Sequence, residues 1–300
     1  MERHTVWITG AGGLIGSQLV QSASRWAPAV RVLPILRDRC DLTDRHAVER
    51  CFAEDSPDLV IHCAGLTRSP LCQSDPALAR RLNVEMTGCL AEVAAARRLI
   101  FLSTDLVFDG RRGMYRETDP PNPLNVYAET KVEAEERVLA HPRHVVVRTS
   151  LNFGESPTGD RAFNEEMAKA WRAGKTLSCF TDEYRSVIPV ESTARALWVL
   201  ARWWLDEPAG DHHRIFHLAG AERLSRWQIA QWVAAQYPEC RPKLEPGSLR
   251  DYQGGPRPAD TSLDIARIQK LLDFSLPRFS EWVRDRLAQR SKDTSVAPGA

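Results

Sequence analysis

Short apolar runs alternate with longer amphipathic segments through the first half of the chain. The short runs, rich in Val, Ile and Leu, predict strands over Thr5–Thr9, Val30–Leu36, Leu59–Cys63, Leu99–Ser103 and His144–Arg148. The segments between them predict helices over Leu14–Arg25, Thr43–Ala53, Pro76–Ala96 and Leu124–Ala140. Strands that alternate with helices are typical of a parallel sheet covered on both faces. We therefore expect residues 1–150 to form a dinucleotide-binding α/β domain with a doubly wound, Rossmann-type sheet.

After residue 150 the pattern changes, because tryptophan becomes denser and strand-like runs become rarer. Helices are predicted over Glu165–Ala173, Ser192–Leu205, Ser225–Gln236 and Phe279–Gln289, with one more strand over Arg214–Leu218. The Pro- and Gly-rich stretch Glu239–Asp260 is expected to be a long loop. Residues 151–290 should form mainly a smaller substrate-binding lobe, and residues 291–300 a disordered tail.

The composition argues against several classes of function. Forty basic residues face 39 acidic ones, so the net charge of +1 indicates neither a nucleic-acid surface nor a membrane-seeking face. No apolar run approaches the roughly 20 residues that a spanning helix needs, and the N-terminus shows no targeting pattern. The seven cysteines are scattered without a C-x-x-C pair. We therefore expect reduced thiols, no metal site and a cytoplasmic location.

A glycine-rich turn, Gly10-Ala11-Gly12-Gly13-Leu14-Ile15-Gly16, follows the first predicted strand. In dinucleotide sites one glycine makes the turn, one admits the pyrophosphate to backbone N–H groups, and one packs the helix on the sheet. The new helix then points its N-terminus at the phosphates. A purely structural turn can carry the same triplet, but its place between a strand and an apolar helix favours a cofactor site. The expected contacts are Gly10, Gly13, Leu14, Ile15 and Gly16.

The end of the second predicted strand bears on the choice of cofactor. NAD sites commonly have an acidic residue there that bonds the ribose hydroxyls. Here Leu36 occupies that place and Arg37 and Arg39 follow, and guanidinium groups suit the 2′-phosphate of NADP(H). Asp38 is an alternative acid, and the arginines can equally be solvated, so NAD stays open. Farther along, the residues expected at the adenine are Asp41, which can also be a plain helix cap, and Leu42.

A candidate catalytic group lies where the fourth predicted strand ends, at Thr104, and on the helix that carries Tyr127 and Lys131. Tyrosine and lysine four residues apart share one helical face. An ammonium beside a phenol lowers the pKa of the phenol from about 10, so Tyr127 is expected to exchange a proton with a substrate oxygen near neutral pH. The Thr104 hydroxyl can bond the same oxygen. Asn122 and Pro123 are expected to begin the helix.

These motifs resemble the extended short-chain dehydrogenase/reductase superfamily from residue 5 to about residue 275. The resemblance rests on the glycine turn, His62–Gly65, Leu82–Val84, Ser103–Gly110 and the Tyr127–Lys131 pair. Within the superfamily, the Ser-Thr-Asp-x-Val-Phe-Asp-Gly run is similar to dTDP-4-dehydrorhamnose reductases, as are Arg148-Thr149-Ser150 and the later Arg257-Pro258.

The resemblance implies that Thr104, Tyr127 and Lys131 are catalytic, that NADP(H) is the cofactor and that the substrate is a nucleotide-activated deoxysugar. It also implies that segments near 187–220 return to the large sheet. His62 should pack rather than catalyse. Further cofactor contacts are expected from Cys63, Ala64, Gly65, Asn83 and Ser103. The residues expected on the substrate side are Thr67, Arg68, Asn152, Arg185 and Arg257.

Departures from the reductase pattern keep other functions open. Leu151–Gly154 replaces a segment that usually carries a tryptophan near the sugar, and Thr181–Arg185 replaces an Asp-Gln pair. We expect Arg185 or Arg257 to clamp a substrate diphosphate, with Glu239–Asp260 closing over it. The alternatives are a sugar-nucleotide epimerase or dehydratase, and a non-catalytic NADP-binding subunit resembling the β subunit of methionine adenosyltransferase. A homodimer also stays open.

Overall fold

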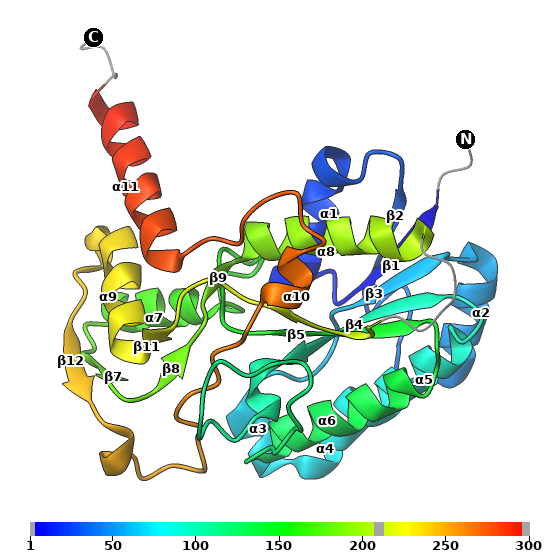
Figure 1. Cartoon of the computed structure of the whole chain (residues 1–300), viewed down its shortest axis with the longest axis horizontal. Helices are drawn as coiled ribbons and strands as arrows, with labels where there is room; N and C mark the ends of the chain where they lie inside the picture. Colours follow the sequence, from blue (N-terminus) through cyan, green and yellow to red (C-terminus); the bar gives the residue numbers. More distant parts are fainter. Residues whose placement is uncertain (1–3, 207–212, 296–300) are drawn as a thin grey trace.

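A six-stranded parallel sheet forms the centre of the computed structural model, which describes residues 4–206 and 213–295 (Figure 1). Its order is β10-β5-β4-β3-β1-β2, so the chain reverses direction across the sheet between β1 and β3, which is where ligands bind in such folds. The prediction of a doubly wound, Rossmann-type α/β fold is confirmed. The strands are β1 (Thr5–Thr9), β2 (Arg31–Ile35), β3 (Leu59–His62), β4 (Arg98–Thr104), β5 (His144–Thr149) and β10 (Ile215–Leu218).

Helices cover both faces of this sheet (Figure 1). On β1, Val6 and Ile8 join the core beneath α1 and α8, whereas Trp7 between them joins the core on the other side. Side chains alternate in this way along every extended strand, so each strand contributes to both cores. The helices are α1 (Leu14–Trp26), α2 (Arg45–Asp55), α3 (Ser69–Ser74), α4 (Pro76–Arg80), α5 (Met86–Val93), α6 (Val126–Leu139) and α8 (Val190–Asp206).

The helix predicted over Pro76–Ala96 is interrupted. The Asp75 side chain caps α4, and a π-helical turn over Arg81–Glu85 separates α4 from α5. Such a turn inserts one extra residue into the helix and is frequent at functional sites. Asn83 lies within the turn, so the interruption falls at a predicted cofactor contact.

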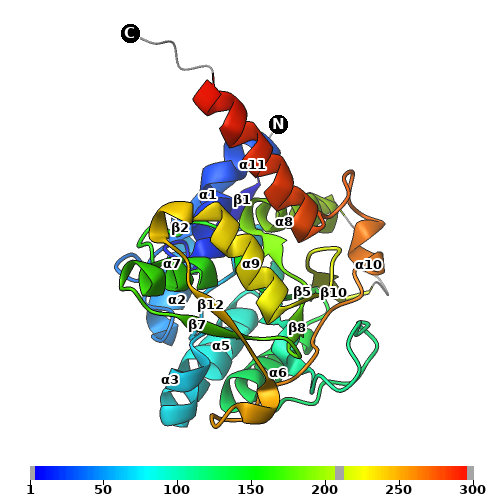
Figure 2. The same cartoon turned by 90° about the vertical axis from the view of Figure 1, so that its left-hand side faces the viewer.

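A second, smaller lobe lies beside the sheet and faces the viewer in Figure 2. Its own core includes Phe153, Trp171, Ile229 and Phe279. The main elements are α7 (Phe163–Arg172), α9 (Arg226–Gln236), α11 (Phe279–Ser295), β7 (Leu177–Phe180), β8 (Tyr184–Arg185), β11 (Leu224–Ser225) and β12 (Leu244–Gly247). Short elements connect the lobe to the sheet: β6 (Asn152–Phe153), β9 (Ile188–Pro189) and α10 (Ala266–Gln269).

Three local predictions are wrong. The loop predicted over Glu239–Asp260 contains β12, which pairs in parallel with β7. The tail predicted from residue 291 begins as helix, because α11 continues to Ser295, while residues 296–300 lie outside the described residues. α6 begins at Val126 with Asn125 as its cap, because the Asn125 side chain accepts a bond from the Ala128 N–H, whereas Asn122 donates to Asp109.

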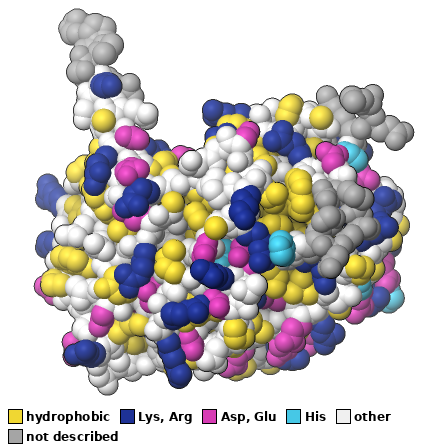
Figure 3. All heavy atoms as spheres, in the orientation of Figure 1, with side chains coloured by type: hydrophobic (Ala, Val, Ile, Leu, Met, Phe, Trp, Pro, Cys, Tyr) yellow, Lys and Arg dark blue, Asp and Glu magenta, His cyan; other side chains and the backbone are white. Residues whose placement is uncertain are grey.

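The surface agrees with the near-neutral composition. Figure 3 shows Lys and Arg side chains interspersed with Asp and Glu across one face. Across residues 4–206 and 213–295, none of the helices combines the length and the apolar character that a bilayer crossing demands. The same residues contain no cluster of three or more side chains placed to hold a metal ion, and all seven cysteines are free.

Candidate active site

The glycine turn joins β1 to α1 and fits a dinucleotide pyrophosphate. Gly10 has φ +65°, and a Cβ there would lie 2.7 Å from the Ala64 nitrogen, so only glycine is accommodated. A Cβ on Gly16 would collide with the Gly10 carbonyl group. No side chain caps α1 behind Gly13, and its first turn has no acidic residue. The leading N–H groups and the positive end of the helix dipole are therefore suited to an anion.

The segment after β2 offers one arginine to the cofactor rather than two. Arg39 is bonded to Asp55 at the end of α2, with an Nη2–Oδ2 distance of 2.6 Å. Arg37 is exposed, and its positive charge acts on Asp41. Leu36, which stands where an acid would favour NAD, is also exposed. This arrangement supports a 2′-phosphate contact through Arg37 alone.

Asp41 is already used by its neighbour. Its Oδ1 atom accepts bonds from the Thr43 N–H at 2.9 Å and the Thr43 hydroxyl at 2.7 Å. These bonds, assisted by Arg37 and Arg81, lower the pKa of Asp41. The cap of α2 is Asp44 instead. A contact from Asp41 to the adenine therefore stays a prediction.

Asn83 fixes the loop that follows β3. Its Oδ1 accepts from the Leu66 N–H at 2.7 Å, and its Nδ2 donates to the Leu66 carbonyl and the Thr130 hydroxyl, both at 3.0 Å. A Cβ on Gly65 would lie 3.0 Å from the Asn83 Oδ1 atom. Asn83 thus fixes the backbone conformation next to Ala64 and Gly65, which are predicted cofactor contacts.

His62 packs beneath this loop, as expected from the sequence. It is fully buried, with Nδ1 2.7 Å from the Thr9 hydroxyl and Nε2 3.1 Å from the Thr87 hydroxyl. Burial, with a smaller contribution from Lys131, lowers the pKa of His62 to about 3. The imidazole is therefore neutral and structural at physiological pH.

The structure brings Thr104, Tyr127 and Lys131 together between β4 and α6. All three are buried, and the Thr104 side chain lies close enough to the Tyr127 phenol to influence its pKa. The Lys131 Nζ donates to the Leu102 carbonyl at 2.7 Å and lies 3.9 Å from the Phe101 ring centre. Both contacts hold the lysine side chain against β4.

The pKa values of the pair run against the expectation of a pre-ionised phenol. Burial raises the pKa of Tyr127 well above 10, assisted by the charge of Asp105, and the neighbouring Thr104 only partly offsets this rise. Burial also lowers the pKa of Lys131 to about 7. For both the phenolate and the ammonium, the free-energy cost of losing water exceeds the stabilisation that neighbouring groups provide. Tyr127 is therefore a neutral proton donor, which is the form that a reduction needs.

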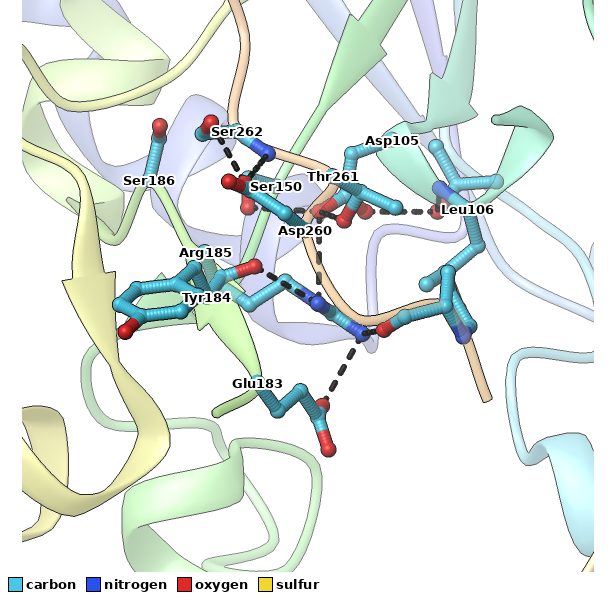
Figure 4. A network of polar contacts seen from close by, with 12 residues as sticks. Asp105, Leu106, Ser150, Glu183, Tyr184, Arg185, Ser186, Asp260, Thr261 and Ser262 are labelled. Carbon is cyan, nitrogen blue, oxygen red and sulfur yellow. Dashed lines mark hydrogen bonds and ion pairs between the residues drawn. The ribbon is translucent and has the colours of Figure 1, made fainter. Parts of the chain in front are cut away.

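Sequence reasoning did not single out a buried network around Asp105 (Figure 4). Its Oδ2 atom accepts from Ser150 at 2.9 Å and Thr261 at 2.8 Å, and its Oδ1 atom accepts from Thr104 at 3.2 Å. Because β4 and β5 are adjacent and parallel, Asp105 and Ser150 at their ends were available from the sequence. Thr261 was not, since it arrives from the other lobe 156 residues later.

Arg185 and Arg257 both contact Glu183, but they differ in exposure. The Arg185 side chain is 5% exposed and lies 3.0 Å from Glu183, while also donating to the Tyr184 and Pro258 carbonyls. The guanidinium of Arg185 is therefore fully used inside the protein, and its role as a diphosphate clamp stays a prediction. Arg257 is 37% exposed and donates to both oxygens of Glu183, at 3.0 and 2.9 Å.

Arg226 is an additional candidate that the sequence did not reveal. It begins α9 and is half-buried. Within residues 4–206 and 213–295 its guanidinium forms no hydrogen bond or ion pair with another side chain. Burial lowers the pKa of Arg226; Glu183 opposes this, while Arg185 and Arg257 reinforce it. Three arginines thus share Glu183, and one positive charge has no carboxylate of its own.

The remaining substrate-side predictions separate into buried and exposed residues. Asn152 is buried, donates to the Thr149 hydroxyl and the Ser150 carbonyl, and accepts from Thr193 at 2.6 Å. It therefore anchors β6, and its contact with a sugar stays a prediction. Thr67 and Arg68 are exposed after β3, where Arg68 lies 3.8 Å from Asp160.

A buried Thr, Tyr and Lys beside a glycine turn on a parallel sheet define the chain as an extended short-chain dehydrogenase/reductase. It belongs to the RmlD substrate binding domain family, which it matches over residues 4–291.

Two curated relatives have different activities in their names. The chain is 29% identical to the methionine adenosyltransferase 2 subunit beta of Danio rerio, over 94% of this chain and 90% of that one. It is also 29% identical to the dTDP-4-dehydrorhamnose reductase of Sinorhizobium fredii, over 92% of this chain and 94% of that one. Among solved structures, the dTDP-4-dehydrorhamnose reductase of Bacillus anthracis in complex with NADP has a TM-score of 0.81 at 23% identity, over 96% and 99% of the chains.

Proposed function

We propose that the chain is an NADPH-dependent reductase of a keto group on a nucleotide-activated deoxysugar. The observation that carries this proposal is the buried contact between Thr104 and a neutral Tyr127, with Lys131 one turn farther along α6. The name of the Sinorhizobium relative supports the substrate class. Exposed Arg37 and the NADP held by the Bacillus neighbour support the cofactor.

The residues present fit the cofactor. The glycine turn and the uncapped start of α1 would hold its pyrophosphate, and Ser103 offers a buried hydroxyl with no partner among the described residues. When bound, the reduced nicotinamide supplies a hydride to the carbonyl carbon. The rest of the chemistry belongs to the chain, which must orient the substrate carbonyl and supply one proton.

Tyr127 supplies that proton to the carbonyl oxygen. Burial keeps the phenol protonated until the oxygen acquires negative charge. Lys131 lies one turn farther along α6, and in this proposal its ammonium then makes Tyr127 a stronger acid. Thr104 lies beside the phenol and positions it. The same enclosure excludes water, which would otherwise compete for the developing charge.

Arg226 and Arg257 bind the substrate diphosphate in this proposal. Arg226 supplies the positive charge without a carboxylate, and exposed Arg257 is held by Glu183 close to two aromatic rings. The ring centres of Phe180 and Tyr252 lie 5.5 and 5.4 Å from the Arg257 guanidinium carbon. A cation beside aromatic surface suits a nucleoside diphosphate. Thr67 and Arg68 remain candidates for its sugar.

Isotope transfer tests the proposal. The protein is incubated with a dTDP-linked 4-keto-6-deoxysugar and NADPH that carries deuterium at the transferable position. A reductase gives a product in which one deuterium has become bonded to the former carbonyl carbon, with one oxidised cofactor per product. An epimerase or dehydratase returns the hydride to the sugar, so product without net cofactor oxidation would contradict the proposal.

A regulatory subunit is the second candidate, favoured by the 29% identity to the Danio rerio subunit over nearly the whole chain. This function predicts cofactor binding without turnover. It predicts no use for a buried proton donor, whereas the reductase requires Tyr127. A protein that binds NADPH but leaves every keto-sugar nucleotide unchanged would favour the regulatory function.

A further inference from the structure

Four ionisable side chains form a line from the small lobe toward the catalytic group, and Figure 4 shows three of them, Glu183, Arg185 and Asp105. Arg257 donates to Glu183, and Glu183 lies 3.0 Å from the Arg185 Nη2 atom. The Arg185 Nε lies 3.8 Å from the Oδ2 atom of Asp105. Asp105 in turn accepts a bond from the Thr104 hydroxyl, which contacts Tyr127. Positive and negative charges alternate along this line.

We propose that Arg185 is a positioning residue that keeps Asp105 ionised and thereby fixes the direction of the Thr104 hydroxyl next to Tyr127. The catalytic part of this inference rests on the proposed function, because it takes Thr104 and Tyr127 as the reacting group. The coupling between Arg185 and Asp105 does not depend on turnover.

The direction of the Thr104 hydroxyl follows from the number of protons available. An ionised carboxylate only accepts hydrogen bonds, and a threonine hydroxyl has one proton to donate. While Asp105 is ionised, the Thr104 proton is directed at its Oδ1 atom. The Thr104 oxygen then accepts from the Leu106 N–H at 3.2 Å and can accept from Tyr127. A protonated Asp105 would release the Thr104 proton and reverse this order.

Opposing effects act on the ionisation of Asp105. Burial is the largest effect and leaves the pKa of Asp105 above its usual range, while the charge of Arg185 and the bonds from Thr261, Ser150 and Thr104 oppose this rise. Among the residues that the structure describes, Arg185 is the charged group that favours the carboxylate. Its guanidinium cannot swing away, because Glu183, the Tyr184 carbonyl and the Pro258 carbonyl hold its remaining nitrogens.

Other titratable groups face Tyr127 from neighbouring elements. Cys72 of α3 raises the pKa of Tyr127, as Asp105 does, and Lys131 lies one turn away on the same helix. Neither contacts Arg185. A change that follows Arg185 alone therefore reports on Asp105 rather than on Cys72 or Lys131.

Infrared spectroscopy of the whole protein tests this inference. The carbonyl stretch of a protonated buried carboxyl group is followed against pH, and Asp105→Asn identifies the band. In Arg185→Met we expect the midpoint of this titration to rise by about one pH unit or more, because a compensating charge is lost. Arg185→Lys keeps the charge and should restore a midpoint close to that of the unaltered protein. Equal midpoints in the Met variant and the unaltered protein would overturn the inference.

A second variant covers the case in which Arg185→Met does not fold. Glu183→Gln removes a negative charge from the same line, so the Asp105 midpoint should move down. A midpoint that stays in place or moves up in this variant would also overturn the coupling.

Kinetics separate this inference from the proposed function. We expect Arg185→Met to lower kcat by roughly tenfold with KM for NADPH unchanged, and Arg185→Lys to recover most of the loss. Turnover together with an unmoved Asp105 midpoint would contradict the coupling alone. A moved midpoint in a protein that reduces no keto-sugar nucleotide would instead contradict the proposed function.

Discussion

The pKa values of Tyr127 and Lys131 are shifted in opposite directions for one physical reason. Burial favours the neutral form of each side chain, which is the protonated phenol for Tyr127 and the deprotonated amine for Lys131. Burial raises the pKa of the phenol and lowers that of the amine from 10.5 to about 7. The amine therefore exchanges its proton within the working pH range, while the phenol keeps its own.

The first prediction concerns the pH dependence that follows from Lys131. Above about pH 7 its ammonium loses a proton, and with it the positive charge that assists proton donation by Tyr127. We expect kcat/KM for NADPH, which reports ionisations of the free enzyme, to fall as the pH rises through about 7. Lys131→Met should have low activity without this step. A step of the same size in the Met variant would show that another group titrates.

The second prediction concerns Arg37 and the choice of cofactor. We expect NADPH to bind at least several-fold more tightly than NADH, because an exposed guanidinium suits the 2′-phosphate. Arg37→Ala should shrink this difference, as measured by fluorescence titration with both cofactors. Arg39→Ala is the matched control and should leave it unchanged, since Arg39 is bonded to Asp55. A preference for NADH that survives Arg37→Ala would contradict the assignment.

The third prediction concerns the unpaired charge of Arg226. Its replacement by alanine should raise KM for the sugar nucleotide by roughly tenfold, as expected for loss of a charge-assisted hydrogen bond worth about 1.5–3 kcal/mol. NADPH affinity should hardly change. Arg172→Ala removes an exposed arginine at the end of α7 in the same lobe and serves as the control. Equal KM values for the two variants would place the diphosphate elsewhere.

The residues in local motifs were predictable, and those assembled from distant segments were not. Spacing on one helical face identified Tyr127 and Lys131, and the Thr104 strand end lay one crossover earlier. Arg226 and Thr261 have no motif around them, because their place depends on how the small lobe meets the sheet. The sequence singled out Arg185, but only its contacts with Glu183 and Asp105 revealed that its charge is already paired.

At the scale of elements, a buried ion pair joins α6 to β5 behind the catalytic group. Arg148 bonds Glu135 through two nitrogens, with Nη2–Oε2 at 2.6 Å, and the two side chains are 2% and 4% exposed. A buried pair of this kind need not stabilise the fold more than apolar residues would. Breaking it is costly, because the remaining charge loses its counter-ion in an apolar setting.

The fourth prediction follows from that asymmetry. Arg148→Met should lower the free energy of unfolding by about 3–5 kcal/mol, as measured by urea denaturation. The control is Arg80→Met. It breaks the exposed pair between Arg80 of α4 and Glu133 of α6, the helix that also carries Glu135, and should lower the free energy of unfolding far less. Similar losses in the two variants would contradict the description of the Arg148–Glu135 pair.

Element types were predictable from periodicity, whereas their interruptions and short pairings were not. A π-helical turn at Arg81–Glu85 leaves the apolar spacing of a long helix nearly unchanged, so nothing in the sequence separated α4 from α5. β12 is four residues long and contains a proline and a glycine. It forms because β7 lies beside it, and such a tertiary effect overrides local propensity.

At the scale of the whole molecule, the two lobes are connected by strand pairing and by a network of ion pairs. β10 returns from the later part of the chain to pair with β5 in the large sheet. The Glu183 network joins the small lobe to Asp105 at the end of β4. Glu239–Asp260 was expected to close over the substrate diphosphate. Because β12 is paired with β7, only the segment from Leu249 to Arg257 stays a candidate for that movement.

The most direct test of the proposed function is the oxidation of NADPH by the purified protein with a dTDP-linked 4-keto-6-deoxysugar. We predict sugar-dependent oxidation, and a fall in turnover of roughly 10²–10⁴ in Tyr127→Phe with NADPH affinity nearly unchanged, because only the proton donor is lost. Absence of oxidation by a protein that binds NADPH, or equal turnover in Tyr127→Phe, would contradict the account.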